Sequence, residues 1–274
     1  NASKLSTVKD DTITATVTTI AGSKIDGAEG ADTLTIAGAA ATTGAFTAAY
    51  NMTTAANLVQ NVETIKFAGK TGAGVLLMPD TIGLKVVNTS PTLAATTVTL
   101  GDGANQAYTA TGSGVNTVIM GGGAGSSVTM TGANGVAQDA TLGAAGQSVS
   151  TGVGDDTVST TRLFGLGSTF NMGAGTNDVL TISASGITAL GATAVSGGAA
   201  AFSGVETVVL TGASTLNVTP TAALTVTAGA GTTAVAGTGT AGLITVTANG
   251  TQITGVSGTS NFAVTAAGAA PIAS

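Results

Sequence analysis

Acidic residues in glycine-rich turns are the side chains of this 274-residue chain that are best placed to do chemistry. Four segments share a nine-residue frame, in which such a turn leads into a strand-like run: GAEGADTLT from Gly27, LGDGANQAY from Leu100, TGSGVNTVI from Thr111 and TGVGDDTVS from Thr151. Ca²⁺ prefers about six to eight oxygen ligands, which backbone carbonyls and carboxylates of such turns can supply. These turns and the one at 173–178 predict Ca²⁺ ligands at Glu29, Asp32, Asp102, Asp155, Asp156 and Asp178.

The same acids have a second interpretation without a metal. An Asp in a Gly-rich turn can accept hydrogen bonds from its own backbone as an Asx-turn. The residues alone leave both interpretations open. A complete site of this kind also needs two adjacent turns, so an isolated frame supplies only half of one.

A longer repeat links two of these acids to glutamates. The segments GAEGADTLTIAG…NVETIKFAG (27–69) and GAGTNDVLTISA…GVETVVLTG (173–212) each contain an Asp, a strand, an Ala/Thr-rich insertion and a Val-Glu-Thr strand. The acids are 31 residues apart in the first (Asp32 to Glu63) and 28 in the second (Asp178 to Glu206). We expect both glutamates to cap backbone groups or to end a coil rather than to bind a metal.

Composition excludes most other chemistry. The chain has no Cys and no His, which excludes disulfides, Cys/His zinc sites, haem and imidazole catalysis. Seven Lys and Arg against 13 acids give a net charge of −6, which excludes a phosphate-binding track and hence nucleic acid. The acid pair Asp155-Asp156 could serve a glycosidase, but the aromatic and basic residues of such clefts are nearly absent. We therefore expect no enzymatic activity.

Strands dominate the expected secondary structure. Short β-branched runs with alternating polarity are bounded by Gly, Asn or Ser, and helix signals are limited to 53–61 and to the Ala-rich window 187–202. The expected strands are Thr12–Ile20, Thr33–Ala37, Glu63–Phe67, Lys85–Val87, Thr96–Leu100, Val179–Ser183, Glu206–Leu210, Leu224–Ala228, Leu243–Ala248, Thr251–Thr254 and Phe262–Ala266.

Gly-rich turns recur about every ten residues from 100 to 158, which is too short for βα units. The predicted fold is all-β: a parallel β-helix or β-roll solenoid with short Ala-rich helical insertions. Stacked short strands would share a narrow core of Val, Ile and Leu, in which large aromatic side chains would not fit. We divide the chain into an N-terminal β-rich unit (1–95), roll-like coils with the second repeat (96–212) and uncharged coils (213–274), and no stretch is apolar enough to span a membrane.

The nine-residue frame resembles the calcium-binding nonapeptide of RTX proteins, and the Asp-to-Glu unit resembles the repeat of RTX-related bacterial surface-layer proteins. Ala28 and Thr151 replace frame glycines, and Asn105 and Asn116 stand where the frame has Asp. The resemblance implies secretion in an unfolded state, Ca²⁺ binding outside the cell and assembly into a lattice on the bacterial cell surface.

The sequence thus favours a structural extracellular protein that assembles with copies of itself, as a layer or a filament, with cell-surface polysaccharide as a candidate anchor. Residues 207–274 contain no charged side chain, which suggests that this surface meets other protein. The alternatives are an adhesin stalk, which would stay a monomeric rod, and an ice-binding or polysaccharide-cleaving β-helix. Ice binding would require several Thr-x-Thr strands in register on one flat face, as in LTVTA and ITVTA.

Overall fold

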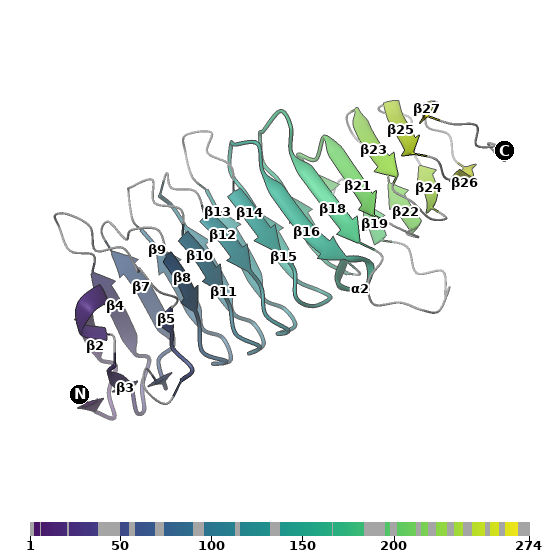
Figure 1. Ribbon diagram of the computed structural model, residues 1–274. Helices are drawn as coiled ribbons and strands as arrows, with labels where there is room; N and C mark the ends of the chain where they lie inside the picture. The colour runs from purple at the N-terminus through teal and green to yellow at the C-terminus, as the bar shows by residue number, and fades with distance from the viewer. Residues whose placement is uncertain are drawn as a thin grey trace.

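The chain winds into a parallel β-solenoid, in which most coils add one strand to each of two long sheets (Figure 1). This confirms the predicted fold class. The computed structural model describes residues 3–5, 7–20, 22–37, 50–54, 58–68, 74–89, 96–112, 116–131, 138–165, 167–183, 195–197, 202–211, 215–218, 223–228, 233–237, 243–249, 253–257 and 261–267. The first and last of the described strands lie at opposite ends of the stack (Figure 1).

The two long sheets contain nine and eleven strands, and all neighbouring strands are parallel. The nine-stranded sheet has the order β2 (Thr12–Thr16), β4 (Thr33–Ala37), β7 (Thr64–Ala68), β9 (Lys85–Asn88), β11 (Ala107–Ala110), β13 (Ser127–Met130), β15 (Ser148–Ser150), β17 (Thr169–Asn171) and β20 (Phe202–Ser203). The eleven-stranded sheet has the order β5 (Tyr50–Asn51), β8 (Gly74–Leu77), β10 (Thr96–Thr99), β12 (Asn116–Ile119), β14 (Gln138–Thr141), β16 (Thr157–Thr161), β18 (Val179–Ser183), β21 (Thr207–Thr211), β23 (Leu224–Ala228), β25 (Leu243–Asn249) and β27 (Asn261–Ala267).

Two shorter sheets and two four-residue helices complete the described elements. The three-stranded sheet has the order β1 (Ser3–Leu5), β3 (Lys24–Asp26) and β6 (Val59–Gln60), and the four-stranded sheet has the order β19 (Val195–Gly197), β22 (Thr215–Val218), β24 (Thr233–Gly237) and β26 (Ile253–Ser257). The helices are α1 (Val17–Ile20) and α2 (Arg162–Gly165). No helix in the described part of the chain is both long and apolar enough to cross a membrane.

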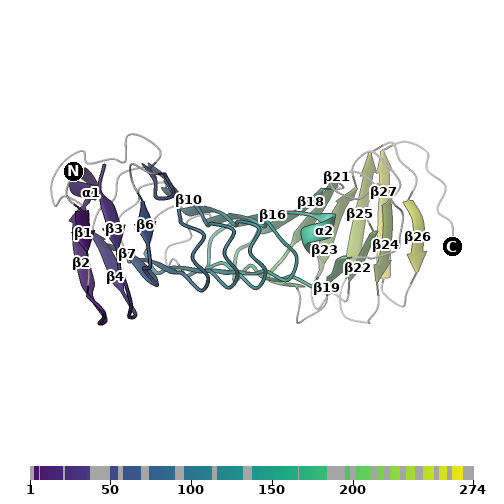
Figure 2. The same ribbon diagram turned by 90° about the horizontal axis from the view of Figure 1, so that it is seen from below.

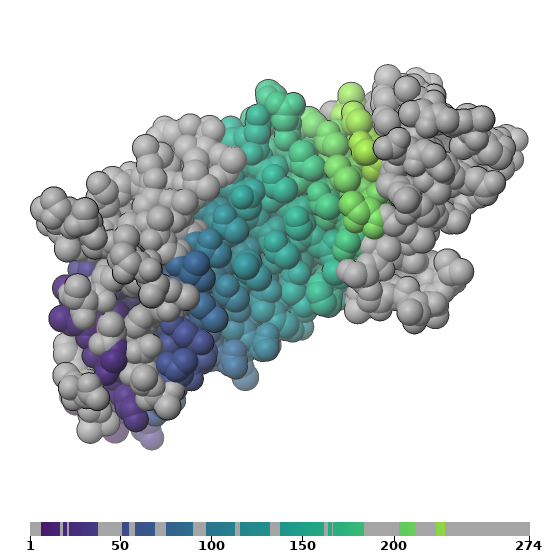
Figure 3. All heavy atoms as spheres, in the orientation of Figure 1, coloured from purple at the N-terminus to yellow at the C-terminus, as the bar shows by residue number. Residues whose placement is uncertain are grey.

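The strand register sets the length of a coil. Thr96 pairs with Asn116, and Asn116 pairs with Gln138, so one coil takes 20 residues and the next takes 22. The spacing of about ten residues between Gly-rich turns is therefore half a coil. Figure 2 shows the coils from β10 to β16 side by side along the axis of the solenoid, and Figure 3 shows their atoms closely packed along one face.

Alternating side chains of both sheets form one continuous apolar core. In β4, Leu34 and Ile36 are buried while Thr33 and Thr35 are partly exposed, and other strands repeat this pattern. Apolar residues also point inward from the turns that follow the eleven-stranded sheet, including Met78, Leu100, Met120 and Leu142. Burial of each such side chain contributes roughly 1.5–3 kcal/mol.

The expectation that large aromatics would not fit this core is wrong. Phe67, Tyr108 and Phe170 are among its largest fully buried side chains. All three lie in the nine-stranded sheet, and Phe67 lies opposite Asn88 while Tyr108 lies opposite Val86 and Val128. Smaller neighbours on both sides leave room for the Tyr108 ring, whereas Phe67 also lies opposite Ile36 and Phe170 lies opposite Phe202.

The predicted helices are also wrong wherever the structure describes them. Of the window 53–61, residues 53–54 form a turn, in which Asn51 Oδ1 accepts hydrogen bonds from Thr53, and 59–60 form β6. Of the window 187–202, residues 195–197 are β19 and Phe202 starts β20; its other residues lie outside the described part of the chain.

A helix lies instead at the end of the expected strand Thr12–Ile20. Strand β2 ends at Thr16, whose Oγ1 accepts the Thr19 N–H at 3.2 Å, while Ser23 Oγ donates to Thr19 O at 2.7 Å. These local side-chain hydrogen bonds to the backbone compete with the strand pattern and turn the chain.

Candidate functional site: two carboxylate ladders

The acidic residues before β16, β18 and β21 form a ladder that runs from coil to coil. The N–H of Gln138 donates to Asp156 Oδ1 at 2.7 Å, the N–H of Asp156 donates to Asp178 Oδ1 at 2.7 Å, and the N–H of Asp178 donates to Glu206 Oε2 at 2.9 Å. Each carboxylate thus accepts a backbone hydrogen bond from the preceding coil. We call these three acids the C-terminal ladder.

The first Asp-to-Glu repeat makes the same arrangement before the nine-stranded sheet. The N–H of Asp11 donates to Asp32 Oδ1 at 2.8 Å, and the N–H of Asp32 donates to Glu63 Oε2 at 2.7 Å. We call Asp11, Asp32 and Glu63 the N-terminal ladder. The prediction that Glu63 and Glu206 cap backbone groups is confirmed.

The two ladders belong to two copies of one structural module, residues 3–68 and 148–211. Strand β1 pairs with β3 as β15 pairs with β17, with Ser3 opposite Lys24 and Ser148 opposite Thr169. In both copies an Asp caps the next turn: Asp10 Oδ1 accepts the Ala31 N–H at 2.9 Å, and Asp155 Oδ1 accepts the Thr176 N–H at 3.1 Å.

The short helices match as well. In α2, Thr161 Oγ1 accepts the Phe164 N–H at 3.2 Å and Ser168 Oγ donates to Phe164 O at 2.7 Å, which repeats the bonds of Thr16, Thr19 and Ser23 around α1. The positive φ angles coincide too, at Gly22 and Gly167, at Ala28 and Gly173, and at Asn61 and Gly204. The modules therefore correspond residue by residue over their first coil.

Burial and like charges raise the pKa values of the two aspartates of the C-terminal ladder, Asp156 and Asp178. Asp178 is fully buried, and desolvation, together with the carboxylates of Asp156 and Glu206, raises its pKa to about 6, although backbone donors oppose the shift. Desolvation also raises the pKa of Asp156, with Asp139 acting in the same direction. By contrast, hydrogen bonds from Thr176 and Asn177 lower the pKa of the exposed Asp155.

The folded protein should therefore lose stability as the pH rises from 4 to 7 in the absence of divalent cations. Asp178 has an ordinary pKa of 3.8 when unfolded, so in this range the folded state binds more protons than the unfolded state. We expect a loss of about 2 kcal/mol after solvent screening is taken into account. Thermal melts at pH 5 and pH 7 in chelator measure it, and Asp178→Asn should flatten the difference; an unchanged pH profile in that variant would contradict the assignment.

Three buried oxygen atoms beside the ladders have no hydrogen-bond partner: Asp156 Oδ2, Thr151 Oγ1 and Asp32 Oδ2. The Thr151 hydroxyl is close enough to Asp156 to lower its pKa in part, but the two oxygens do not meet hydrogen-bond geometry. Unpartnered carboxylate and hydroxyl oxygens are ligands that Ca²⁺ accepts. The turn from 151 to 156 therefore contains two oxygen atoms of the kind that Ca²⁺ accepts.

The exposed candidates cap turns of the next coil. Asp155 Oδ1 accepts the N–H groups of Thr176 and Asn177, both at 3.1 Å, and Asp102 Oδ1 accepts the Gly122 N–H at 2.6 Å. The Asx-turn interpretation holds only in a modified form, since these bonds reach the neighbouring coil. Glu29 is exposed in the turn before β4.

The six predicted ligands do not form one site. Asp155, Asp156 and Asp178 lie in successive turns that lead into the eleven-stranded sheet, Glu29 and Asp32 lie in the first module, and Asp102 lies in a turn that leads into the nine-stranded sheet. Among the residues described here, no three acidic side chains gather as a metal-binding group.

Sequence reasoning missed a buried amide network that continues the C-terminal ladder. Asn88 Nδ2 donates to Asn116 Oδ1 at 3.1 Å, the Tyr108 hydroxyl donates to the same oxygen at 2.9 Å, and Asn116 Nδ2 donates to Gln138 Oε1 at 3.1 Å. The sequence feature that could have revealed this network is Asn116, which stands at the Asp position of its nine-residue frame.

A second missed feature is a pair of buried glutamines in the turns before the nine-stranded sheet. Gln106 Nε2 donates to the carbonyls of Pro79 and Thr81, at 2.8 and 2.9 Å. Gln147 Nε2 donates in the same way to Gly121 and Gly123, both at 2.9 Å. Buried side chains of both types thus form hydrogen bonds with the backbone of the adjacent coil: the amides donate to its carbonyl groups, and the carboxylates accept from its N–H groups.

Comparison of the chain with protein-family models, with curated proteins and with solved structures yields no match.

Proposed function

We propose that this chain is a structural protein of the bacterial cell surface, outside the cell, which assembles with copies of itself and is stabilised by Ca²⁺. The observation that carries the proposal is the use of the acidic residues. The two ladders and the capping residues Asp102 and Asp155 direct their carboxylates at backbone N–H groups of a neighbouring coil. These hydrogen bonds hold neighbouring coils together, and a structural rod must keep its coils together under load.

The outward face of the eleven-stranded sheet supports lateral contact between copies. Its outward positions in register from β10 to β23 are mostly Thr and Ser, with Asp139 as their charged residue. Val75 and Ile119 are exposed on the same face. A face with so little charge has little electrostatic repulsion to overcome when it meets another protein surface.

The same register favours the structural proposal over ice binding. A column of outward residues runs Thr97, Thr117, Asp139, Thr157, Val179, in consecutive coils. A carboxylate and a valine interrupt the hydroxyl array that ice binding would require.

Ca²⁺ would be held by Asp156 and Thr151, whose unpartnered buried oxygens fit it, and by Asp32 in the first module. When bound, the ion would neutralise carboxylates that otherwise repel one another along the ladder. Calcium should therefore raise the melting temperature most at neutral pH, where Asp178 is ionised.

Negative-stain microscopy of the purified chain in millimolar Ca²⁺ and in chelator tests the proposal. We expect sheets or filaments with Ca²⁺ and disassembly in chelator. Asp156→Asn should raise the Ca²⁺ concentration that is needed for assembly. Asp102→Asn serves as the matched control, because Asp102 lies in an exposed turn that leads into the nine-stranded sheet. Monodisperse rods under both conditions would refute self-assembly and favour an adhesin stalk. Assembly indifferent to chelator would refute the role of Ca²⁺ alone.

A further inference from the structure

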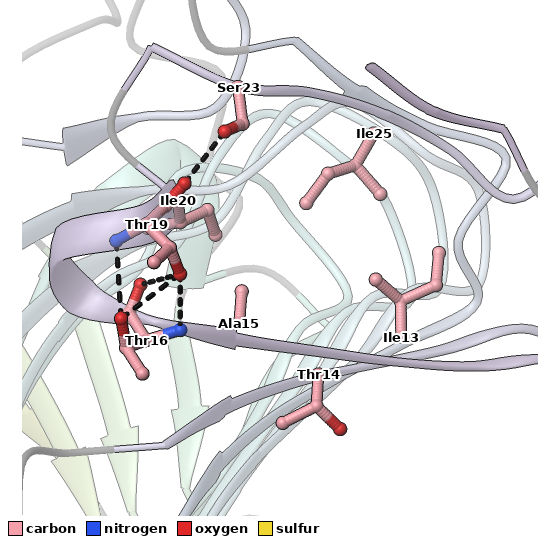
Figure 4. A pocket seen from close by; sticks show the side chains of 8 residues that line it. All are labelled: Ile13, Thr14, Ala15, Thr16, Thr19, Ile20, Ser23 and Ile25. Carbon is pink, nitrogen blue, oxygen red and sulfur yellow. Dashed lines mark hydrogen bonds between the residues drawn. The ribbon is translucent and has the colours of Figure 1, made fainter. Parts of the chain in front are cut away.

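The two long sheets present outward faces on opposite sides of the solenoid. Side chains alternate along each strand, so every second residue points away from the core. Figure 4 shows this at β2, where Ile13 and Ala15 point to one side of the strand and Thr14 points to the other. The inward side chains of both sheets belong to one core, so the two outward faces point away from each other.

The outward positions of the nine-stranded sheet carry positive charge only. In register from β4 to β17 they are mostly Thr, Ser and Ala, and their charged residues are Lys66 in β7 and Lys85 in β9. Both lysines are exposed, and they lie on neighbouring strands, since Lys85 pairs with Thr64 and Lys66 pairs with Val87. Among the described strands of this sheet, no acidic residue occupies an outward position.

The outward face of the eleven-stranded sheet carries the opposite charge. Asp139 in β14 is the charged residue of its outward positions from β10 to β23, and it lies between Thr117 and Thr157. Contact between two like faces brings no opposite charges together, whereas contact between unlike faces does. The charges of the chain therefore favour contact of the nine-stranded face with the eleven-stranded face.

Both charged positions lie inside their sheets. Lys85 is in the fourth of nine strands and Asp139 in the fifth of eleven, so a contact that brings them together continues over strands on either side. At about 4.8 Å between strands and about 3.3 Å per residue, the nine-stranded face measures roughly 40 Å by 13 Å. Full contact would bury about 1,000 Å² in total, the area at which specific interfaces begin. Since a surface ion pair adds little affinity, the charges would chiefly select the face and set the register.

We propose that the solenoids pack side by side, with the nine-stranded face of one copy on the eleven-stranded face of the next and with Lys66 and Lys85 beside Asp139. A second copy is the partner, because each copy carries both complementary faces. The two faces lie on opposite sides, so each copy binds one neighbour on each side and the contact repeats as an open row. This inference rests on the proposed self-assembly and names one interface of it.

Charge-reversal variants of the full chain test this contact. Asp139→Lys makes both faces positive, and Lys66→Glu combined with Lys85→Glu makes both faces negative. The assembled fraction of each protein alone, measured by sedimentation in millimolar Ca²⁺ and by negative-stain microscopy, should fall about tenfold or more, because like charges meet at every contact. An equimolar mixture of the two should assemble as the unmodified chain does, because opposite charges meet again at every contact.

A second double variant is the matched control. Lys9→Glu combined with Lys24→Glu makes the same change of net charge at exposed positions before β2 and in β3, outside the nine-stranded sheet, and should assemble normally. Far-UV circular dichroism establishes that all variants fold.

Two results would overturn this contact and leave the proposed function intact. One is normal assembly of the Lys66→Glu and Lys85→Glu double variant on its own, which contact between two eleven-stranded faces would give. The other is a mixture that stays unassembled although the unmodified chain assembles. Failure of the unmodified chain to assemble would refute the proposed function itself, and this contact with it.

Discussion

Replacing Gly121 with alanine is expected to destabilise the folded protein by about 3 kcal/mol or more. Gly121 lies in the turn before β13, stacked on Gly101 of the preceding coil. A Cβ atom on Gly121 would overlap the carbonyl oxygen and carbon of Gly101 and approach the carbonyl oxygen of Leu100. These are backbone atoms, so the overlap is relieved only if the two coils separate, which would break the hydrogen bonds between them.

Its neighbours in the same triplet provide the controls. A Cβ on Gly123 would overlap the carbonyl of Gly103, so Gly123→Ala should be as damaging as Gly121→Ala. A Cβ on Gly122 would have only the end of the Asp102 side chain nearby, at 3.3 Å, and that side chain is exposed. Gly122→Ala should therefore change the stability by less than about 1 kcal/mol.

Urea unfolding of the three variants, followed by circular dichroism, measures the difference. Equal midpoints for Gly121→Ala and Gly122→Ala would show that the stacked turns can separate at little cost, contrary to the close packing described above.

Replacing Asp178 with alanine is the second change with a large expected effect. Asp178 Oδ1 accepts the Asp156 N–H at 2.7 Å and Oδ2 accepts the Gly175 N–H at 3.2 Å. Alanine would leave both donors without an acceptor; the desolvation cost of each unsatisfied buried group is about 1–3 kcal/mol. We expect a loss of about 3 kcal/mol in total, because relaxation and water entry recover part of the cost.

The matched variants separate the hydrogen bonds from the charge. Asp178→Asn keeps a carbonyl acceptor for Asp156 and removes the repelling charge, so at pH 7 it should be far less destabilising than alanine. Asp102→Ala removes an acceptor of the same type from an exposed turn, where water can replace it, and should cost less than about 1 kcal/mol. Thermal melts in chelator measure all three; equal losses for the two Asp178 variants would contradict an acceptor role.

Several strands could be predicted to the residue. Thr33–Ala37, Val179–Ser183 and Leu224–Ala228 have the predicted bounds, because alternation of apolar and polar residues matches a strand with one buried face. Strands such as β13 (SVTM) and β15 (SVS) were missed because they are too short and too small-sided to produce a clear pattern.

For the acidic residues of the candidate site, too, only part of the arrangement could be predicted from the sequence. Their positions in Gly-rich turns, and the match of Asp32 and Glu63 to Asp178 and Glu206, were visible from sequence. Their partners were not, because each accepts a hydrogen bond from a residue 18 to 31 positions earlier in the chain. Such a pairing exists only once the register between coils is set.

The parallel solenoid could be predicted from the sequence alone, since short β-branched runs between Gly-rich turns can bury their apolar faces only by stacking on one another. It did not reveal the coil length of about 20 residues, the place of aromatic rings in the core, or the extension of the repeat from 27–69 and 173–212 back to residues 3–26 and 148–172. These features depend on which strand lies beside which. That register follows from the packing of many weak contacts at once rather than from any local run of residues, so it becomes visible only in the folded structure.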